Sequence, residues 1–318
     1  MIKRAFILAA GLGTRMKELT HAIPKPMIEV AGQSLITRLI DQLIAYGITQ
    51  IVINIFYKAD LLMEHVKEHM RLHAPAIKVF FSQESELLDT GGGIINALKY
   101  LEDKPFFVIN NDSIFVGKEN VFAFLNNNWK SSMNMLFLLT PAEKAMGYDG
   151  KGDFLLGDKN QLIRIDHTSR TKLHEGHRVY VYTGIHITTP EIFRGHTPGK
   201  IKLMDIYDNA LKKEQEIQTL NQGSAPHPPQ SRHLLPSGEK KEGVDSFPSP
   251  QIVEGKDGGG YSPFPSPLRG EGAAIAADEG GGSQFETSFL GHGIIYPGQW
   301  LHVGTPGALK QAKLYLKK

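Results

Sequence analysis

The sequence predicts an α/β protein with a parallel sheet at its centre, and two observations support this fold class. Short apolar runs of strand length alternate with longer runs of helical periodicity through the first half of the chain. Glycine or a helix-capping residue stands at several of the junctions between these runs. Such alternation is typical of consecutive βαβ units, whose strands lie parallel and whose helices cover the sheet.

The first strand is predicted over residues 3–9, where the run KRAFILA stops at a glycine-rich turn. The length of the run and the glycines after it favour a strand over a buried helix. The turn contains Gly11, Gly13, Thr14 and Arg15. Glycine lets backbone N–H groups approach phosphate oxygens, and arginine adds a permanently charged donor. The spacing matches neither common phosphate loop, so by spacing alone an ordinary turn explains it at least as well.

A lysine between two prolines follows this turn. Pro24 and Pro26 fix their own φ angles and push the residues before them towards extended geometry. Lys25 therefore lies on a stiff segment, which suits an ammonium group that must meet a phosphate.

Alternating elements continue beyond this lysine. Ser34 and Gly47 are expected to cap the two ends of a helix that contains residues 35–44. A strand at 50–56, a helix at 59–71 and a strand at 77–81 follow.

Two histidines in the second of these helices have a possible metal-binding spacing. His65 and His69 lie one helical turn apart, but no glutamate stands beside His65 and no third ligand is evident. We expect them to lie on a solvated helix face.

Residues 82–93 form a polar segment that ends in three glycines, and an apolar helix is expected over 94–101. The glycines could belong to a flexible linker, but a strand before them and a helix after them favour a loop that approaches a ligand. The next strand, 105–110, leads into Asp112, which lies where doubly wound folds bind ligands. An aspartate at this place could equally cap a turn.

The second half of the chain is less regular. We expect strands over 133–139 and 179–187, the second interrupted by Thr183 and Gly184, and a glycine-rich loop over 147–154 whose alternative is a hairpin turn. Helices are predicted over 203–213 and 307–316, the last one with Thr305 as its cap and Pro306 in its first turn.

Composition excludes several classes of protein. A formal net charge of +2 gives no electrostatic case for a nucleic acid or an anionic membrane as partner. The chain has no cysteine, so disulfides and thiolate chemistry are excluded. No signal peptide and no membrane-spanning run is evident, so we expect a soluble cytoplasmic protein.

The motif LAAGLGTRM followed by PKPM resembles the start of the sugar-1-phosphate nucleotidyltransferases. The resemblance extends over most of the chain. It implies a Rossmann-like nucleotidyltransferase fold with a mixed central sheet and a small sugar-binding lobe. It also implies transfer of a nucleotidyl group from a nucleoside triphosphate to a sugar 1-phosphate, with release of pyrophosphate.

The family's motifs imply a role for each matching residue of this chain. Arg15 and Lys25 would be catalytic, and Asp112 would bind a magnesium ion. The nucleotide would contact Ala10, Gly11, Gly13, Thr14, Arg15, Glu84, Gly91 and Gly92, and the sugar would contact Gly152, Asp153, Thr183 and Gly184.

The chain departs from the family at a second metal ligand, where His302 stands in place of an aspartate. Magnesium prefers oxygen ligands, and imidazole suits Mn²⁺, Co²⁺ or Zn²⁺ better. The expected cofactor is therefore Mg²⁺, with Mn²⁺ as the alternative.

The triple glycine after Thr90 is most similar to the branch that makes UDP-N-acetylmuramic acid, which implies UTP and N-acetylmuramic acid 1-phosphate as substrates in cell-wall recycling. A mannose- or heptose-1-phosphate guanylyltransferase is the alternative. A third possibility is a catalytically impaired relative that only binds sugar nucleotides. The presence of Arg15, Lys25 and Asp112 argues against this third reading.

The composition changes abruptly at residues 223–284, where prolines and glycines concentrate and the motif FPSP occurs twice. This segment has too little apolar surface to offset the entropy cost of ordering it. We expect a disordered insertion, with a proline-rich docking segment as the alternative. The nucleotidyltransferase core would then comprise residues 1–215 and 285–318.

Overall fold

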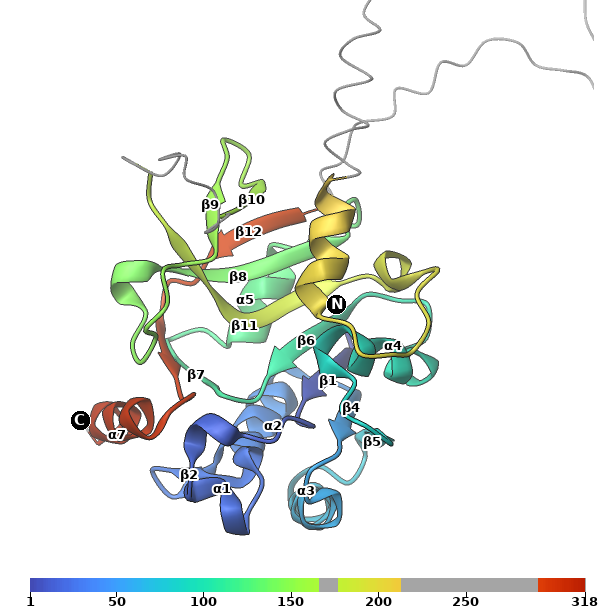
Figure 1. Ribbon diagram of the computed structural model, residues 1–318, viewed down its shortest axis with the longest axis vertical. Coiled ribbons are helices and arrows are strands. Elements are labelled where there is room, and N and C mark those ends of the chain that lie inside the picture. Colours follow the sequence, from blue (N-terminus) through green and yellow to red (C-terminus); the bar gives the residue numbers. More distant parts are fainter. Residues whose placement is uncertain (166–176, 213–290, 318) are drawn as a thin grey trace, which may run out of the picture. The chain divides into compact units, whose positions relative to one another are not determined.

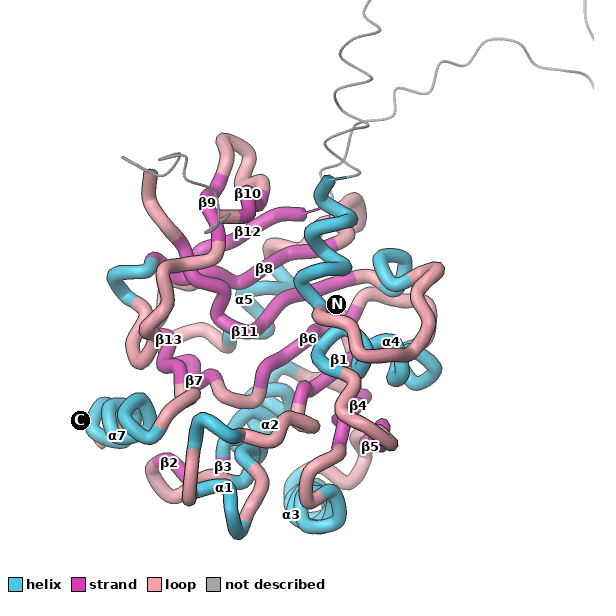
Figure 2. The backbone as a smooth tube through the Cα atoms, in the orientation of Figure 1, coloured by secondary structure: helices cyan, strands magenta, loops and turns pink. Residues whose placement is uncertain are grey.

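The computed structural model describes residues 1–165, 177–212 and 291–317. Within these residues the fold is organised by one mixed sheet with helices on both faces. The strands are magenta in Figure 2, where the sheet can be followed from β5 through β1 and β6 to β12. The expected Rossmann-like architecture with a mixed central sheet is confirmed.

One half of the sheet is parallel. Its centre is β1 (Arg4–Leu8), which pairs with β4 (Gln50–Ile55) on one side and β6 (Phe106–Asn110) on the other. Beyond β4 lies β5 (Lys78–Gln83). These are the strands that the apolar runs predicted, and their carboxyl ends meet at one edge of the sheet.

The other half of the sheet is mostly antiparallel. Next to β6 lies β11 (Tyr180–Thr188), which pairs in turn with β8 (Met135–Pro141). The strand β12 (Gly291–Ile295) adds to β8 in parallel, and the hairpin of β9 (Phe154–Leu156) and β10 (Leu162–Arg164) extends the sheet from β11. Segments on the two sides of the undescribed residues 213–290 thus share one sheet.

Helices cover the two faces of the sheet (Figure 1). The helices α2 (Leu35–Tyr46), α3 (Ala59–His73) and α5 (Val121–Asn127) pack against one face. On the other face lie α4 (Asp89–Leu101) and a helix over 203–212.

The central strand shows why both faces are apolar. Ile7 contributes to the cluster under α2 and α3, whereas its neighbour Phe6 contributes to the cluster under α4. Successive side chains of a strand point to opposite faces. A strand covered on both sides must therefore be apolar throughout, which is the continuous run seen in the sequence.

Smaller elements complete the described part of the chain. Several of them contribute to a third apolar cluster that includes Met16, Leu35 and Leu309. They comprise the helices α1 (Leu19–Ala22) and α7 (Pro306–Tyr315), the strand pairs β2 (Glu29–Val30) with β3 (Gln33–Ser34) and β7 (Ser113–Val116) with β13 (Gln299–His302), and the 3₁₀ helices η1 (Thr14–Met16), η2 (Lys25–Met27), η3 (Ala142–Lys144) and η4 (Pro190–Phe193).

The predicted helix caps are confirmed. The Ser34 side chain accepts from the backbone N–H of Thr37, and the Thr305 side chain accepts from that of Ala308. Gly47 ends α2 in the left-handed conformation, with φ 91°.

The prediction for the triple glycine is wrong. Helix α4 begins at Asp89, so the three glycines lie in its first turns and not in a loop before it. Glycine is required at positions 91 and 92 because the backbone near residue 200 lies directly against this part of the helix. A Cβ on Gly92 would lie 1.8 Å from the carbonyl oxygen of Gly199, and one on Gly91 would lie 2.9 Å from that of Ile201. Larger residues would push this segment, 199–203, off the helix.

The expectation for the two histidines is also wrong. His65 Nε2 lies 2.9 Å from Ser34 Oγ, and His69 Nε2 lies 2.7 Å from Asp41 Oδ1. Both side chains are half-buried and link α3 to α2, so they neither face solvent freely nor form a metal site.

The predicted insertion, 223–284, lies outside the described residues, and its disorder stays a prediction. Among the helices that the structure describes, none is long and apolar enough to cross a membrane.

Candidate active site

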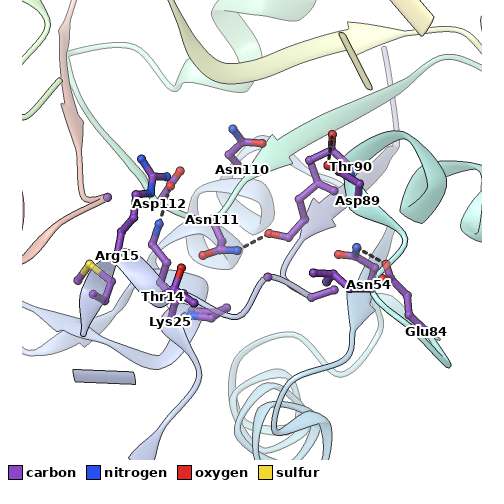
Figure 3. Close-up of a pocket in the computed structure, with 18 of the residues that line it drawn as sticks. Thr14, Arg15, Lys25, Asn54, Glu84, Asp89, Thr90, Asn110, Asn111 and Asp112 are labelled. Carbon is purple, nitrogen blue, oxygen red and sulfur yellow. Dashed lines mark hydrogen bonds and ion pairs between the residues drawn. The ribbon is translucent and has the colours of Figure 1, made fainter. Parts of the chain in front are cut away.

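A cavity of about 390 Å³ opens where β1, β4 and β6 end (Figure 3). The carboxyl ends of parallel strands are the usual place for ligands in such sheets. Eight of the residues predicted for the site line this cavity: Ala10, Gly11, Gly13, Thr14, Arg15, Lys25, Glu84 and Asp112.

The glycine turn after β1 forms one wall of the cavity. Gly13 has φ 67°, and a Cβ there would lie 2.9 Å from Thr20 Cγ2, so conformation and space both require glycine. Gly11 is different, since no atom beyond Gly11 and the two residues adjacent to it lies within 4 Å of where its Cβ would be. The Gly11 backbone thus borders open space, as an approach to phosphate oxygens requires.

Lys25 and Asp112 form an ion pair at the same end of the cavity. The Nζ atom lies 2.6 Å from Asp112 Oδ2, and the two side chains are only 12% and 14% exposed. Lys25 begins η2 directly after Pro24, and Asp112 follows β6. Ile23, before Pro24, is extended as predicted, but Lys25, before Pro26, is helical, because the 3₁₀ turn begins at this lysine. Its ammonium group lies where β6 delivers a carboxylate.

Asp112 is held in its ionised form. Burial alone would raise its pKa, but the positive charge of Lys25, the hydrogen bond that Lys25 donates and the positive charge of Arg15 lower it below its ordinary value. Figure 3 shows Arg15, Lys25 and Asp112 together at this end of the cavity.

His302 lies next to Asp112, although it is not among the residues that line the cavity. The residue stands opposite Ser113 in the pairing of β13 with β7, and Val303 donates its N–H to the Asp112 carbonyl at 2.7 Å. Burial lowers the pKa of His302, and Lys25 and Arg15 lower it further, against the opposing effect of Asp112. The imidazole is therefore neutral near pH 7, with a nitrogen lone pair available.

These donors fit a magnesium ion. The described residues contain no group of three or more His, Cys, Asp or Glu that could hold a metal by themselves. Magnesium does not need such a cage, because it keeps several waters and takes phosphate oxygens beside one or two carboxylates. One ionised carboxylate at the cationic end of the cavity, that of Asp112, meets this requirement.

The opposite end of the cavity is built around Glu84. Its Oε1 accepts from Asn54 Nδ2 at 2.7 Å, and its Oε2 accepts from the Leu88 N–H at 3.0 Å. Burial raises the pKa of Glu84, the nearby Asp89 raises it further, and the two hydrogen bonds oppose this. Asp89 and Thr90 complete this end.

Gly91 and Gly92 do not line the cavity. Their N–H groups donate to the Ile201 carbonyl at 2.9 and 3.1 Å, so the N-terminus of α4 is capped by the 199–203 segment. The same segment brings Lys200, an exposed side chain, to the edge of the cavity.

The four residues predicted to contact the sugar also lie outside the cavity lining. The Thr183 hydroxyl is buried and donates to the Leu138 carbonyl at 2.8 Å. Asp153 Oδ2 accepts from the Tyr182 N–H at 2.9 Å. Gly152 and Gly184 have φ 91° and 88°, and both are packed against protein atoms. The sugar-binding role of these residues stays a prediction.

Several residues of the cavity were missed in the sequence. Asn54, Asn110 and Asn111 stand at or just beyond the carboxyl ends of strands, so the rule that selected Asp112 would also have selected them. Asp89 and Lys200 carry no comparable local signal, because α4 and the 199–203 segment place them there.

Comparison with known proteins identifies the family of this chain. The profile of the family described as "Nucleotidyl transferase" matches residues 4–150. Over 210 residues the chain is 34% identical to N-acetylmuramate alpha-1-phosphate uridylyltransferase of Caulobacter vibrioides, which covers 64% of this chain and 83% of that protein. Mannose-1-phosphate guanyltransferase of Aspergillus oryzae is 38% identical over 113 residues, which is 35% of this chain but only 30% of that protein.

A solved structure confirms the fold. HddC from Yersinia pseudotuberculosis, crystallised with GMP-PN, superposes with a TM-score of 0.58 at 19% identity, over 99% of this chain and all of that one. The length and identity of the match to the Caulobacter protein, together with the family profile, settle the family: the chain belongs to the sugar-1-phosphate nucleotidyltransferases.

Proposed function

We propose that this protein transfers the uridylyl group of UTP to N-acetylmuramic acid 1-phosphate, in the recycling of peptidoglycan sugars. The main observation in support of a transfer reaction is that the two ends of the cavity differ in chemistry. Arg15, Lys25 and Asp112 stand at one end, and Asn54 and Glu84 stand at the other. This arrangement suits a molecule with a polyphosphate at one side and a hydrogen-bonding base at the other. The relative from Caulobacter supports the choice of uridine and of this sugar.

The reaction is an in-line displacement at the α-phosphorus. A phosphate oxygen of the sugar phosphate forms a bond to this phosphorus, the bond to the bridging oxygen of the β-phosphate breaks, and pyrophosphate leaves with the electron pair. No proton transfer is required of the protein. Its contribution is to align the two anions and neutralise their charge.

Arg15 and Lys25 supply this neutralisation. The Lys25 ammonium group has three N–H donors, and Asp112 is the one hydrogen-bond partner that the described residues offer to this group. Donors remain for phosphate oxygens on both sides of the bond that breaks. Arg15 adds a forked donor from the wall of the cavity.

We propose Mg²⁺ as the cofactor, held by Asp112 together with triphosphate oxygens and water. Such an ion neutralises charge on the phosphates when bound. The neutral imidazole of His302, beside Asp112, is a nitrogen donor that would favour Mn²⁺ relative to a site made of carboxylates.

A guanylyltransferase is the second candidate, and Glu84 provides the observation in its favour. Both of its oxygens already accept hydrogen bonds from the protein, so as a carboxylate it offers acceptors only. Guanine presents two adjacent N–H donors on one edge, whereas uracil presents one.

Pyrophosphate release over a grid of UTP, GTP, CTP, ATP and dTTP against the 1-phosphates of N-acetylmuramic acid, N-acetylglucosamine, mannose and glucose tests the proposal. We expect UTP with N-acetylmuramic acid 1-phosphate to exceed every other pair at least about tenfold. A maximum with GTP and mannose 1-phosphate would replace the proposal with the second candidate. Nucleotide binding without release for any pair would indicate a protein that only binds.

A further inference from the structure

Asn54 lies between the two strands that lead into the two ends of the cavity. In β4 it stands beside Leu8 of β1 and beside Ser82 of β5. After β1 comes the glycine turn, and after β5 comes Glu84. Asn54 is 2% exposed, so this polar side chain is buried within the sheet edge that carries the site.

The orientation of the Asn54 amide follows from its partners. The Ala9 N–H can only donate, and it lies 2.7 Å from Asn54 Oδ1. The carbonyl oxygen must therefore face Ala9, and the NH₂ group must face Glu84. At 2.7 Å from Nδ2, Glu84 Oε1 can only accept.

Glu84 is thereby fixed as an acceptor. Its second oxygen accepts from the Leu88 N–H, and the side chain is 4% exposed. Among the described residues no lysine, arginine or histidine pairs with it, and the charged group that bears on it is Asp89 on α4. A carboxylate buried in this way depends on its hydrogen bonds to stay in one position.

Helix α4 packs over the Asn54–Glu84 pair and has a glycine where it meets these two side chains. A Cβ on Gly93 of α4 would lie 2.7 Å from Asn54 Nδ2 and 2.8 Å from Glu84 Oε1. Any other residue at 93 would push the two side chains apart. The third glycine of the triple is thus explained by the Asn54–Glu84 contact, whereas the first two are explained by the 199–203 segment.

We propose that Asn54 is a positioning residue for nucleotide binding, which joins the glycine turn at Ala9 to the Glu84 carboxylate and holds that carboxylate as an acceptor facing the cavity. The proposal rests on the proposed function, because it takes the bound molecule to be a nucleotide whose phosphates meet the turn and whose base meets Glu84. One amide then couples the two ends of the site.

Reversing the hydrogen bond tests this role. Asn54→Asp places a carboxylate against Glu84, and Glu84→Gln places an amide NH₂ against either Asn54 Nδ2 or the Leu88 N–H. Each single change therefore breaks the contact. The double variant N54D/E84Q restores it with the donor and acceptor exchanged, while the introduced carboxylate still accepts from Ala9.

Calorimetric titration with UTP alone, without sugar phosphate, measures the effect. We expect each single variant to bind UTP roughly 10- to 100-fold more weakly than the wild type. We expect the double variant to bind at least about tenfold more tightly than either single one. Asn96→Asp is the matched control, because Asn96 Nδ2 also donates across from α4 to β5, to Ser82 Oγ at 3.0 Å, outside the cavity. This control should bind as the wild type does.

A pH titration adds a readout that loss of structure would not produce. In N54D, one of the two facing carboxylates can take up a proton as the pH is lowered. The UTP affinity of N54D should therefore recover relative to that of the wild type when the pH is lowered from about 8 to about 6. Asp89 is the further acid that acts on this pair, and it is unchanged in every variant. The control N96D should show no such recovery.

The outcomes are distinct. Equal affinities for N54D and N96D, or a double variant no better than the single ones, would overturn the positioning role. If N54D does not fold, the comparison of E84Q with the double variant still decides the point. A wild type that binds no nucleoside triphosphate would overturn the proposed function, and this proposal with it.

Discussion

Replacing Lys25 by alanine should affect both stability and catalysis, and the structure gives a magnitude for the first effect. The ammonium group lies 2.6 Å from Asp112 Oδ2, and both side chains are largely buried. Removing one partner of a buried ion pair leaves the other charge uncompensated, at a cost of about 3–5 kcal/mol. Arg15 also acts on the Asp112 carboxylate, so we expect about 3 kcal/mol. For a core of roughly 250 residues this lowers the melting temperature by about 6–12 °C.

The loss of activity should exceed any loss that unfolding of the variant would cause. Lys25 is placed to neutralise charge on both phosphates as the α-phosphorus changes partners, so its removal should lower kcat by roughly 10²–10³. The loss should persist at temperatures where the variant is fully folded.

Two further variants separate the effects. The double variant K25A/D112N has no uncompensated carboxylate, so it should regain most of the lost melting temperature while staying inactive. Lys3→Ala is the matched control, because Lys3 donates to the Gly47 carbonyl at 2.9 Å, away from the cavity. Steady-state pyrophosphate release and thermal unfolding are measured on all four proteins. A kcat for K25A within a few-fold of the wild type would refute the role assigned to this lysine.

Four other predictions concern other parts of the chain. His302→Asp should lower the activity with Mn²⁺ relative to the activity with Mg²⁺, as seen by titrating both ions in the activity assay; identical profiles would show that the imidazole does not reach the ion. Gly92→Ala should lower the melting temperature sharply, because its Cβ would meet the Gly199 carbonyl at 1.8 Å; an unchanged value would contradict the packing of this segment. Burial lowers the pKa of His186 to about 3, so between about pH 6.5 and about pH 3 the unfolded chain binds more protons than the folded one. The free energy of unfolding should therefore decrease as the pH is lowered through this range, and H186Q should flatten this slope in denaturant titrations. Deletion of 223–284 should leave activity and melting temperature nearly unchanged, as its composition suggests, and a large loss of either would show that it packs on the core.

The elements that could be predicted from the sequence are those whose cause is local. The strand over Arg4–Leu8 and the turn after it follow from an apolar run that ends in glycine. The caps at Ser34 and Thr305 follow from side chains that bond to the next turn of the chain. In each case the partner lies a few residues away, so the pattern contains the whole explanation.

The features that were missed or misjudged have distant causes. The glycines at 91 and 92 look like a loop, but residues near 200 require them. His65 and His69 look solvated, but their partners are Ser34 and Asp41 in another part of the chain. Lys25 and Asp112 were each selected for the site, yet nothing in the sequence shows that these two, 87 positions apart, pair with each other.

The central claim is that the protein transfers a nucleotidyl group from a triphosphate to a sugar phosphate, and that the reaction takes place in this cavity. The most direct measurement follows UTP labelled with ³²P at the α-position, incubated with N-acetylmuramic acid 1-phosphate. The label should move entirely into a UDP-sugar in amounts equal to the pyrophosphate released, and the K25A protein should form this product roughly 10²–10³ times more slowly. Recovery of the label as free UMP, or equal label transfer by K25A, would contradict the account.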